Sequence, residues 1–355
     1  MSERAHKYAD SSMDLAALAE IIEKFAGKKI VLFGDFVADE FQYGEISRVS
    51  REAPVLILRH RGTTVVPGGG ANAANNLAAL GAKVIPVTVV GDDAAGAALA
   101  NHFRSIGVTA SGIFRAKDWA TPTKTRFLAG WTHTVGQQVL RVDRQPESGP
   151  AANTMAKVFA KLKASLRGAD GLAVSDYGFG VATPAAVKDL THLTQGKSGP
   201  GLVTLDARYQ LEAYANCGIS AATPNEAELE ALHHTSIGRN AEELAKCGRA
   251  TLQKMRLQSL LVTRGKDGMA LFEREGKRLT QIPVHGSDQA VDVTGAGDTV
   301  LAAYTLALAA GGSALEAAQI ANIAGGLVVM KRGTAVVTRA ELLAAIRAEV
   351  SGGAS

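Results

Sequence analysis

The sequence is poor in cysteine and in aromatic residues. Only two of its 355 residues are cysteines, Cys217 and Cys247, which is too few for a disulfide framework or a cysteine-ligated zinc site. Buried free thiols are expected instead. Aromatic residues make up 5% of the chain and are not interleaved with blocks of lysine or arginine, and the net charge of +4 is small and dispersed. A nucleic-acid partner is therefore not expected.

Long hydrophobic runs are missing as well. No stretch reaches the roughly 18 consecutive apolar residues that a membrane-spanning helix requires. Residues 1–28 combine charged side chains with a short amphipathic run, Leu15, Leu18, Ile22 and Phe25, and lack the apolar core of a secretory signal. We therefore expect no membrane partner, and a cytoplasmic location follows by default.

Several catalytic motifs are also missing. The chain has no P-loop pattern, and its first apolar run leads into GDFVADEF, which lacks the second and third glycines of a dinucleotide-binding fingerprint. Neither HExxH nor GxSxG occurs. The main sequence evidence is therefore missing for three classes of enzyme: zinc peptidases, serine hydrolases and nicotinamide-dependent oxidoreductases.

What the sequence does contain is a regular alternation of short apolar runs and helical stretches. Hydrophobic residues make up 46% and charged residues 20%, as in ordinary globular proteins. Helical stretches such as 71–80, 94–106 and 240–256 separate runs with the length and composition of buried strands: KKIVLFGD, KVIPVTVVG, GLAVSD, GLVTLD and SLLVTRG. This rhythm predicts an α/β fold with a mainly parallel sheet and helices on both faces.

Two segments, 42–66 and 112–143, break this rhythm. They are rich in Thr, Val, Arg and aromatic residues and lack helical periodicity, so we expect them to form strands of a small separate sheet. Because both segments flank early strand–helix units, we place this sheet over the ligand end of the main one, as a lid.

Three glycines, Gly68, Gly69 and Gly70, lead into the helical stretch ANAANNLAAL. Glycines let a backbone approach a ligand closely, and Asn72 and Asn75 offer directional amide hydrogen bonds. A tight turn with packing asparagines explains the same residues equally well. Both interpretations stay open at this point.

The segment VDVTGAGDTV, residues 291–300, joins a glycine turn to a long helix. Free N–H groups and the helix dipole make the turn from Gly295 to Asp298 an anion hole that suits a transferring phosphoryl group. Aspartate has an ordinary pKa of about 3.9, so an ionised Asp298 is a candidate general base for a substrate hydroxyl. The alternative is an ordinary carboxylate at a helix start.

The segment ATPNEAELEAL places Asn225 and Glu228 three residues apart after a strand-like run. If both face one crevice, their oxygens suit Mg²⁺, which keeps most of its waters and takes few protein ligands. The alternative is a helix cap with glutamates that face solvent.

These motifs, in this order, resemble the ribokinase, or phosphofructokinase-B, family of carbohydrate kinases. The resemblance covers residues 29–347 and is carried by GGGAN, TPNEAE, VTRGKDG and DVTGAGDT. It implies a ribokinase-like α/β core with a Rossmann-like sheet and a small β-sheet lid. It also implies an N-terminal extension and helix over 1–28, a kinase domain over 29–350, and phosphorylation of a sugar hydroxyl with ATP and Mg²⁺.

The resemblance also assigns roles to single residues. Asp298 is implied as the catalytic base. The implied anion hole consists of Gly295, Ala296 and Gly297. The implied nucleotide contacts are Asn225, Glu226, Ala227, Glu228, Thr263, Gly265 and Asn322, and Glu228 would hold Mg²⁺ directly or through water. The implied sugar contacts are Asp35, Asp39, Gly69, Gly70 and Asn72. Asp292 and Thr294 match residues that hold a monovalent cation such as K⁺ in some members, which we keep as a hypothesis.

Within the family, the nearest likeness is the branch that phosphorylates D-glycero-β-D-manno-heptose 7-phosphate at O1, as a stand-alone kinase domain. The segments that carry this likeness are GDFVADEFQYGEISRVSREAPVLIL, PTKTRFL, QQVLRVD and SDYGFG. That reaction leads to ADP-heptose and the lipopolysaccharide core. The sugar already carries a phosphate, and cations of the expected lid are candidates to hold it: Arg48, Lys124, Arg126 and Arg141.

Some positions depart from that branch. SDYGFG has Phe179 where a lysine is expected, and DAR, with Ala207 and Arg208, stands where DPK is expected. Two alternatives therefore stay open: a kinase for another sugar or for a nucleoside, such as ribose, fructose or an adenosine-like compound, and a non-catalytic sugar- or nucleotide-binding regulator on the same fold. Unpaired edges of the lid favour a homodimer.

Overall fold

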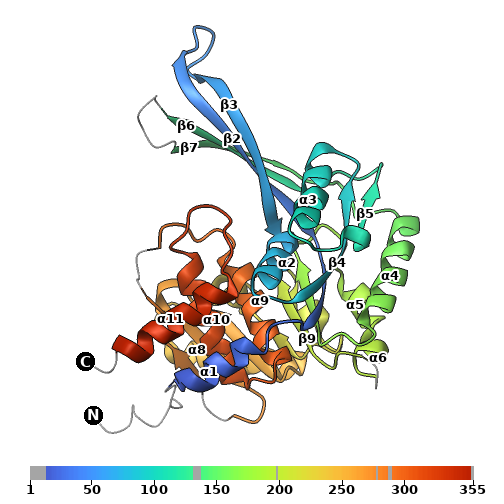
Figure 1. Ribbon diagram of the computed structural model, residues 1–355, viewed down its shortest axis with the longest axis vertical. Helices are drawn as coiled ribbons and strands as arrows, with labels where there is room; N and C mark the ends of the chain where they lie inside the picture. The colour runs from blue at the N-terminus through green and yellow to red at the C-terminus, as the bar shows by residue number, and fades with distance from the viewer. Residues whose placement is uncertain (1–12, 131–136, 197–198, 277–278, 287–289, 353–355) are drawn as a thin grey trace.

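A nine-stranded sheet forms the centre of the molecule (Figure 1). The computed structural model describes residues 13–130, 137–196, 199–276, 279–286 and 290–352. In sheet order the strands are β13 (Thr280–Ile282), β12 (Met269–Glu273), β11 (Ser259–Thr263), β10 (Ala221–Ala222), β9 (Val203–Ala207), β8 (Gly171–Asp176), β1 (Lys29–Gly34), β4 (Lys83–Gly91) and β5 (Ile113–Ala116). All neighbours from β11 to β5 pair in parallel, and β12 and β13 pair antiparallel at one edge. The predicted mainly parallel sheet is confirmed.

Helices cover both faces of this sheet, as the sequence predicts. One face is covered by α1 (Leu15–Glu23), α2 (Gly70–Ala79), α3 (Ala94–Ser105), α9 (Ala296–Ala309), α10 (Ala314–Val328) and α11 (Arg339–Gly352). The other is covered by α4 (Ala152–Leu166), α5 (Pro184–Lys188), α6 (Thr191–Thr194), α7 (Glu226–His233) and α8 (Ala241–Met255). Cys217 and Cys247 are buried free thiols in the second core, as expected. Within the described residues, no helix is both long and apolar enough to cross a membrane.

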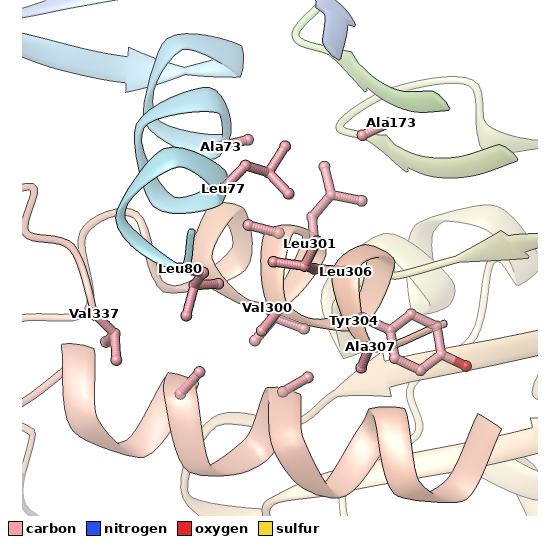
Figure 2. Packing of buried hydrophobic residues seen from close by; sticks show 14 of the residues in the cluster. Ala73, Leu77, Leu80, Ala173, Val300, Leu301, Tyr304, Leu306, Ala307 and Val337 are labelled. Atoms are coloured by element: carbon pink, nitrogen blue, oxygen red, sulfur yellow. The ribbon is translucent and has the colours of Figure 1, made fainter. Parts of the chain in front are cut away.

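The α9 helix is buried because nearly every residue of its first three turns is apolar or small. Figure 2 shows Leu77 of α2 and Leu80, the residue that follows this helix, next to Val300 and Leu301 of α9. The alanines of α9 let α10 lie close alongside. A leucine truncated to alanine in such a core typically costs about 2–5 kcal/mol. This packing fixes the N-terminus of α9 relative to α2 and to the sheet.

A second sheet of four strands projects from the main body as a lid (Figure 1). Its order is β3 (Leu56–Gly69), β2 (Phe36–Val49), β6 (Thr123–Gly130) and β7 (Gln137–Arg144). The small sheet is confirmed, but the strands β2 and β3 extend beyond the expected 42–66. Within 112–143, Ile113–Ala116 joins the edge of the large sheet instead, through parallel pairs with β4. The segment 131–136 lies outside the described residues.

The lid grows directly out of the carboxyl end of the large sheet. Only Asp35 separates β1 from β2, and Gly69 and Gly70 join β3 to α2. The first residues of β2, Phe36 to Ala38, are buried in the main body, whereas its distal half is half-buried or exposed. Residues at the root of the lid therefore lie at the carboxyl ends of the parallel strands, where α/β folds bind ligands.

Candidate active site

Asp298 lies in the first turn of α9 and is only 3% exposed. Gly295, the N-cap of this helix, has φ +78°, and a Cβ there would lie 2.4 Å from the side-chain nitrogen of Asn72. A side chain at this position is therefore excluded by both backbone and space. A Cβ at Gly297 would meet nothing within 4 Å. The predicted anion hole thus has open space beside the helix start, where the N–H of Ala296 already donates to the carbonyl of Val293 at 3.3 Å.

Two neutral side chains hold the carboxylate of Asp298. The amide of Asn72 donates to Oδ2 at 2.9 Å, and the hydroxyl of Tyr177 donates to Oδ1 at 2.8 Å. Asn72 is itself fixed by Asn76, whose amide donates to the Asn72 carbonyl and side-chain oxygens at 3.0 and 3.1 Å. The structure thus brings together α2, the turn after β8 and α9 at a single carboxylate.

The surroundings of Asp298 make it a stronger base than an aspartate in water. Burial is the main cause that raises its pKa, with a contribution from Asp39, and the hydrogen bonds from Asn72 and Tyr177 and the charge of Lys124 lower it, so that it reaches about 7. General bases work best when their pKa is close to the working pH. The site therefore suits proton transfer near neutral pH.

Asp35 does not fit the predicted role of a sugar contact. It is fully buried, and its carboxylate accepts the N–H groups of Tyr177, Phe179 and Val181 at 2.9–3.0 Å. Burial raises the pKa of Asp35 to about 6, against the effect of these hydrogen bonds. Asp35 therefore supports the turn after β8, since no oxygen of its side chain faces open space.

The glycines before α2 are required by neighbouring protein groups. A Cβ at Gly68 would lie 2.5 Å from Oδ2 of Asp39, and one at Gly70 would lie 2.9 Å from the carbonyl oxygen of Asp35. Gly69 has φ +55°, and its Cβ would lie 3.2 Å from the ring of Tyr177. Of the two interpretations of this run, the structure supports a tight turn whose close packing places Asn72 at the site.

Asp39 lies at the root of the lid and is paired with Arg126. The guanidinium Nη1 lies 2.6 Å from Oδ1, with the side chains 12% and 6% exposed, and the hydroxyl of Thr334 donates to Oδ2 at 3.0 Å. Lys124, two residues closer to the large sheet on β6, places its Nζ 5.5 Å from the centre of the Tyr177 ring. Asp39, Arg126 and Lys124 thus line the lid side of the Asp298 site.

The other two lid cations differ in their placement. Arg141 pairs with Arg126 across β6 and β7 and forms a fork with Asp143 at 2.7 and 2.5 Å. Arg48 is exposed and lies seven residues beyond Phe41, the residue opposite Arg126, past two irregularities of β2. Seven strand residues span roughly 20 Å. The structure therefore does not bring Arg48 together with the other three cations.

A cavity of about 920 Å³ lies between the lid and the segments 291–294 and 332–334. Its lining includes Phe41, Tyr43, Arg61, Arg126, Arg332 and Thr334. Asp292, also on its wall, accepts the N–H groups of Thr294 and Gly333 at 2.9 Å. Although burial raises the pKa of Asp292, these hydrogen bonds hold it below its usual range. Both carboxylate oxygens thus already have protein donors, and a cation at Asp292 and Thr294 stays a hypothesis.

The predicted nucleotide residues gather at the carboxyl ends of β10 and β11. Asn225 forms a parallel bridge with Thr263, and Gly265 follows in a turn with φ +54° and open space where a Cβ would be. Glu226 is paired with Arg264, and Ala227 is exposed. Asn322 is 7% exposed and donates to the carbonyl of Pro283 at 2.7 Å.

Asn225 and Glu228 form a reciprocal capping box at the start of α7. The Asn225 side chain accepts the N–H of Glu228 at 2.8 Å, and the Glu228 carboxylate accepts the N–H of Asn225 at 2.9 Å. The structure therefore shows the helix-cap alternative. Glu228 differs from that alternative in one respect, because its side chain is half-buried and does not face solvent fully.

A carboxylate that the motif analysis missed, Asp206, faces Glu228 from the end of β9. Burial, then the facing charges of Glu228 and Asp298, raise the pKa of Asp206 far above its ordinary value. Burial also raises the pKa of Glu228. Tyr177 was missed as well. Tyr177 directly follows β8 and Asp206 is the penultimate residue of β9, and this place at the carboxyl end of a parallel strand is the signal that identifies them.

Asp206 and Glu228 face each other, and a negative charge on one makes ionisation of the other less favourable. A divalent cation beside them would favour the ionised forms. Among the described residues no cluster of three or more acidic, histidine or cysteine side chains could hold a metal by itself. The arrangement therefore fits a Mg²⁺ ion that takes most of its ligands from phosphate and water, with Glu228 as the protein partner.

Known proteins resemble the chain in sequence and in fold. The model of the pfkB family of carbohydrate kinases matches residues 28–340. The bifunctional protein HldE of Caulobacter vibrioides is 38% identical over 333 residues, which cover 92% of this chain and 65% of that protein. This chain thus spans slightly less than two-thirds of the length of that relative.

Solved structures share the ribokinase-like α/β fold. Arabidopsis thaliana ribokinase, solved with ribose and ATP, matches with a TM-score of 0.68 and 21% identity, over 91% of this chain and 99% of that one. Phosphofructokinase-2 from Escherichia coli, solved with potassium, matches with a TM-score of 0.72 and 20% identity, over 92% and 99%. The predicted fold class is confirmed.

Proposed function

Because the chain belongs to the pfkB family of carbohydrate kinases, and so is a phosphotransferase that acts on a sugar hydroxyl, we propose that it phosphorylates D-glycero-β-D-manno-heptose 7-phosphate at O1 with ATP. The product would be the 1,7-bisphosphate, a precursor of ADP-heptose and the lipopolysaccharide core. The sequence likeness to the bifunctional protein HldE over 92% of the chain supports this substrate. A cytoplasmic location is part of the same proposal.

One observation carries the proposed chemistry: a buried carboxylate with a pKa of about 7 stands in the first turn of a helix whose glycine turn is open. The O1 hydroxyl would give its proton to Asp298 while its oxygen forms a bond to the γ-phosphorus of ATP. The bond from that phosphorus to the bridging oxygen breaks, and ADP leaves. The N–H groups at Gly295 to Gly297 would stabilise charge on the transferred group.

ATP would lie on the side of Asn225, Thr263 and Gly265, where the turn after β11 has open space. Mg²⁺ would be held beside Glu228, and when bound it neutralises charge on the phosphates. Asp206 faces the same space, and an ion bound there would favour its ionised form, which burial and the charges of Glu228 and Asp298 disfavour. K⁺ at Asp292 and Thr294 remains a hypothesis that activity measurements in Na⁺ and K⁺ salts would test.

The distal phosphate of the sugar would bind the lid cations. Arg126 and Arg141 form one pair of β6 and β7, and Lys124 lies two pairs away on β6. Lys124 has no carboxylate within ion-pair distance among the described residues. Burial and the neighbouring arginines lower the pKa of Lys124, and Asp39 opposes them. A dianion between these cations would relieve their mutual repulsion.

The lid also supports the proposal of a homodimer. Every residue of β7 is exposed, and Val139, Leu140 and Val142 are 44–55% exposed on this edge strand. Exposed apolar edge strands usually pair with another chain. Sedimentation equilibrium would show a dimer that Leu140→Lys dissociates; a wild-type monomer at micromolar concentration would contradict this proposal.

The substrate is tested by ADP release on a panel of acceptors. The panel contains heptose 7-phosphate, the same heptose without phosphate, ribose, fructose, fructose 6-phosphate and adenosine, each with the Asp298→Asn variant as the blank. We expect the highest kcat/KM with heptose 7-phosphate and at least a tenfold loss without its phosphate. A preference for a neutral sugar or a nucleoside would show that heptose 7-phosphate is not the substrate. Absence of ADP release with every acceptor would favour a binding regulator.

A further inference from the structure

Tyr177 contacts the carboxylate of Asp298 directly, although none of the motifs assigns it a role. Its hydroxyl holds Oδ1 at 2.8 Å while the amide of Asn72 holds Oδ2 at 2.9 Å. An ionised carboxylate has about four lone-pair positions, so both bonds leave room for a substrate hydroxyl. Donors on both oxygens fix the plane of the carboxylate and the direction of its free lone pairs.

The backbone of Tyr177 is fixed by a buried anchor. Its N–H and the N–H groups of Phe179 and Val181 all donate to the carboxylate of Asp35 at 2.9–3.0 Å. Asp35 is fully buried between the start of the lid and β8. Three bonds to one anchor hold the turn after β8 in a single conformation.

The ring of Tyr177 is fixed from two further sides. A Cβ at Gly69 would lie 3.2 Å from Cε2, so the absence of a side chain there makes room for the ring. On the lid side, Nζ of Lys124 lies 5.5 Å from the ring centre, within the range of a cation–π contact. The direction of the Tyr177 hydroxyl is thus determined by the main body and by the lid together.

We propose that Tyr177 is a positioning residue: its hydroxyl fixes the Asp298 carboxylate in the direction in which it accepts the proton of the acceptor sugar. This inference rests on the proposed kinase function, because it names the group that orients the base of that reaction. It predicts an effect on proton transfer and no effect on nucleotide binding.

A change in pH dependence distinguishes this role from a structural one. The Tyr177 hydroxyl is one of the groups that lower the pKa of Asp298, against the larger effect of burial. The charged groups that face this pair from the lid, from β9 and from the turn after β9 are Asp39, Lys124, Asp206 and Arg208. They stay in place in Tyr177→Phe, which also keeps the ring and its contacts. Loss of the hydroxyl therefore raises the pKa of the base.

The experiment measures kcat between pH 5.5 and 9.5 for the wild type and Tyr177→Phe with saturating ATP and heptose 7-phosphate. Hydrogen bonds to charged groups change an equilibrium by about ten- to a hundredfold. We therefore expect the acid limb of the variant to move up by about one to two pH units. The loss should be about ten- to a hundredfold at pH 6.5 and should be smaller at pH 9, where only the altered direction of the ionised carboxylate still lowers kcat, with an unchanged Kd for ATP.

Two matched variants serve as controls. Tyr304→Phe removes another buried hydroxyl, which donates to Ser259 at 2.7 Å, and Tyr209→Phe removes an exposed one, which accepts from Nε of Arg208 at 3.3 Å. Neither should move the acid limb. If Tyr177→Phe only lowers the melting temperature and leaves the limb in place, the inference is wrong. If the wild type phosphorylates a different sugar, the pH profile is measured with that sugar. A failure of the heptose proposal is then distinguished from a failure of the Tyr177 proposal.

Discussion

Asp298→Asn should abolish turnover and at the same time stabilise the folded protein. Asparagine has the size of aspartate and can keep both hydrogen bonds: its oxygen accepts from the amide of Asn72, and its own amide donates to the hydroxyl oxygen of Tyr177. The variant therefore removes the charge and the proton acceptor with little change in packing.

The size of the stabilisation follows from the pKa of Asp298. Burial is the main cause that raises it from 3.8 to about 7. Between these values the unfolded chain releases its proton and the folded protein keeps it, so this group lowers stability progressively as the pH rises. Above pH 7 both states are ionised and the penalty stays constant, at about 4 kcal/mol. The asparagine variant has no such penalty.

Urea unfolding of the wild type and of Asp298→Asn at pH 5 and pH 8 measures this effect. The difference in unfolding free energy should grow by about 3 kcal/mol from pH 5 to pH 8, since each pH unit up to 7 contributes about 1.4 kcal/mol. The matched control is Asp93→Asn at the N-cap of α3. There, hydrogen bonds from Gly96 and Thr121 outweigh the effect of burial and hold the pKa below 3.8, so its difference should not change over this range.

Activity provides the second readout for Asp298→Asn. Positioned general bases contribute about 10²- to 10⁴-fold in rate, and we expect a loss of kcat of at least this size with ATP binding retained in calorimetry. A difference in stability that is the same at both pH values would refute the raised pKa. Wild-type turnover would refute the role of the carboxylate as base.

Two further pairs of variants test the turn and the lid. Gly295→Ala forces a Cβ to 2.4 Å from an amide nitrogen of α2 at φ +78°, so it should lower both the urea midpoint and kcat; Gly297→Ala, with open space, should lower kcat alone. Arg126→Gln leaves Asp39 buried without its cation and should cost about 3 kcal/mol or more. Arg141→Gln breaks an exposed pair and should cost at most about 1 kcal/mol; equal losses in the two arginine variants would contradict this assignment.

The sequence was sufficient to predict the architecture because strand and helix periods are local properties. The alternating apolar runs gave the parallel sheet and the helices on both faces, and the aromatic, threonine-rich segments gave the lid. The bounds of the lid were harder to predict, because Phe36 to Ala38 are as apolar as a core strand and are buried in the main body although they belong to β2. Ile113–Ala116 could pair with either sheet, and only its packing beside β4 decides.

The residue types of the site could be predicted from the sequence, but the contacts between these residues were harder to predict. The sugar contact of Asn72 stays a prediction, and the bond from its amide to Asp298, 226 positions away in sequence, was not predicted. Asp35 and Asp39 stand four residues apart in one segment, yet one is an internal anchor and the other faces the lid side of the site. These outcomes depend on which elements meet at the carboxyl ends of the strands, which local patterns do not contain.

The placement of Asp298 links function and stability in this fold. An exposed aspartate with an ordinary pKa is ionised at pH 7 but is a weak base, whereas burial at the start of α9 brings its pKa to about 7. The same burial costs about 4 kcal/mol, a large part of the 5–15 kcal/mol by which domains are typically stable. The apolar contacts that fix α9 between α2 and α10 offset this cost. If Asp298 is the base, as we propose, the long buried helix behind the glycine turn serves the chemistry as well as the fold, because a loosely packed helix would let water reach the carboxylate and return its pKa toward that of an exposed aspartate.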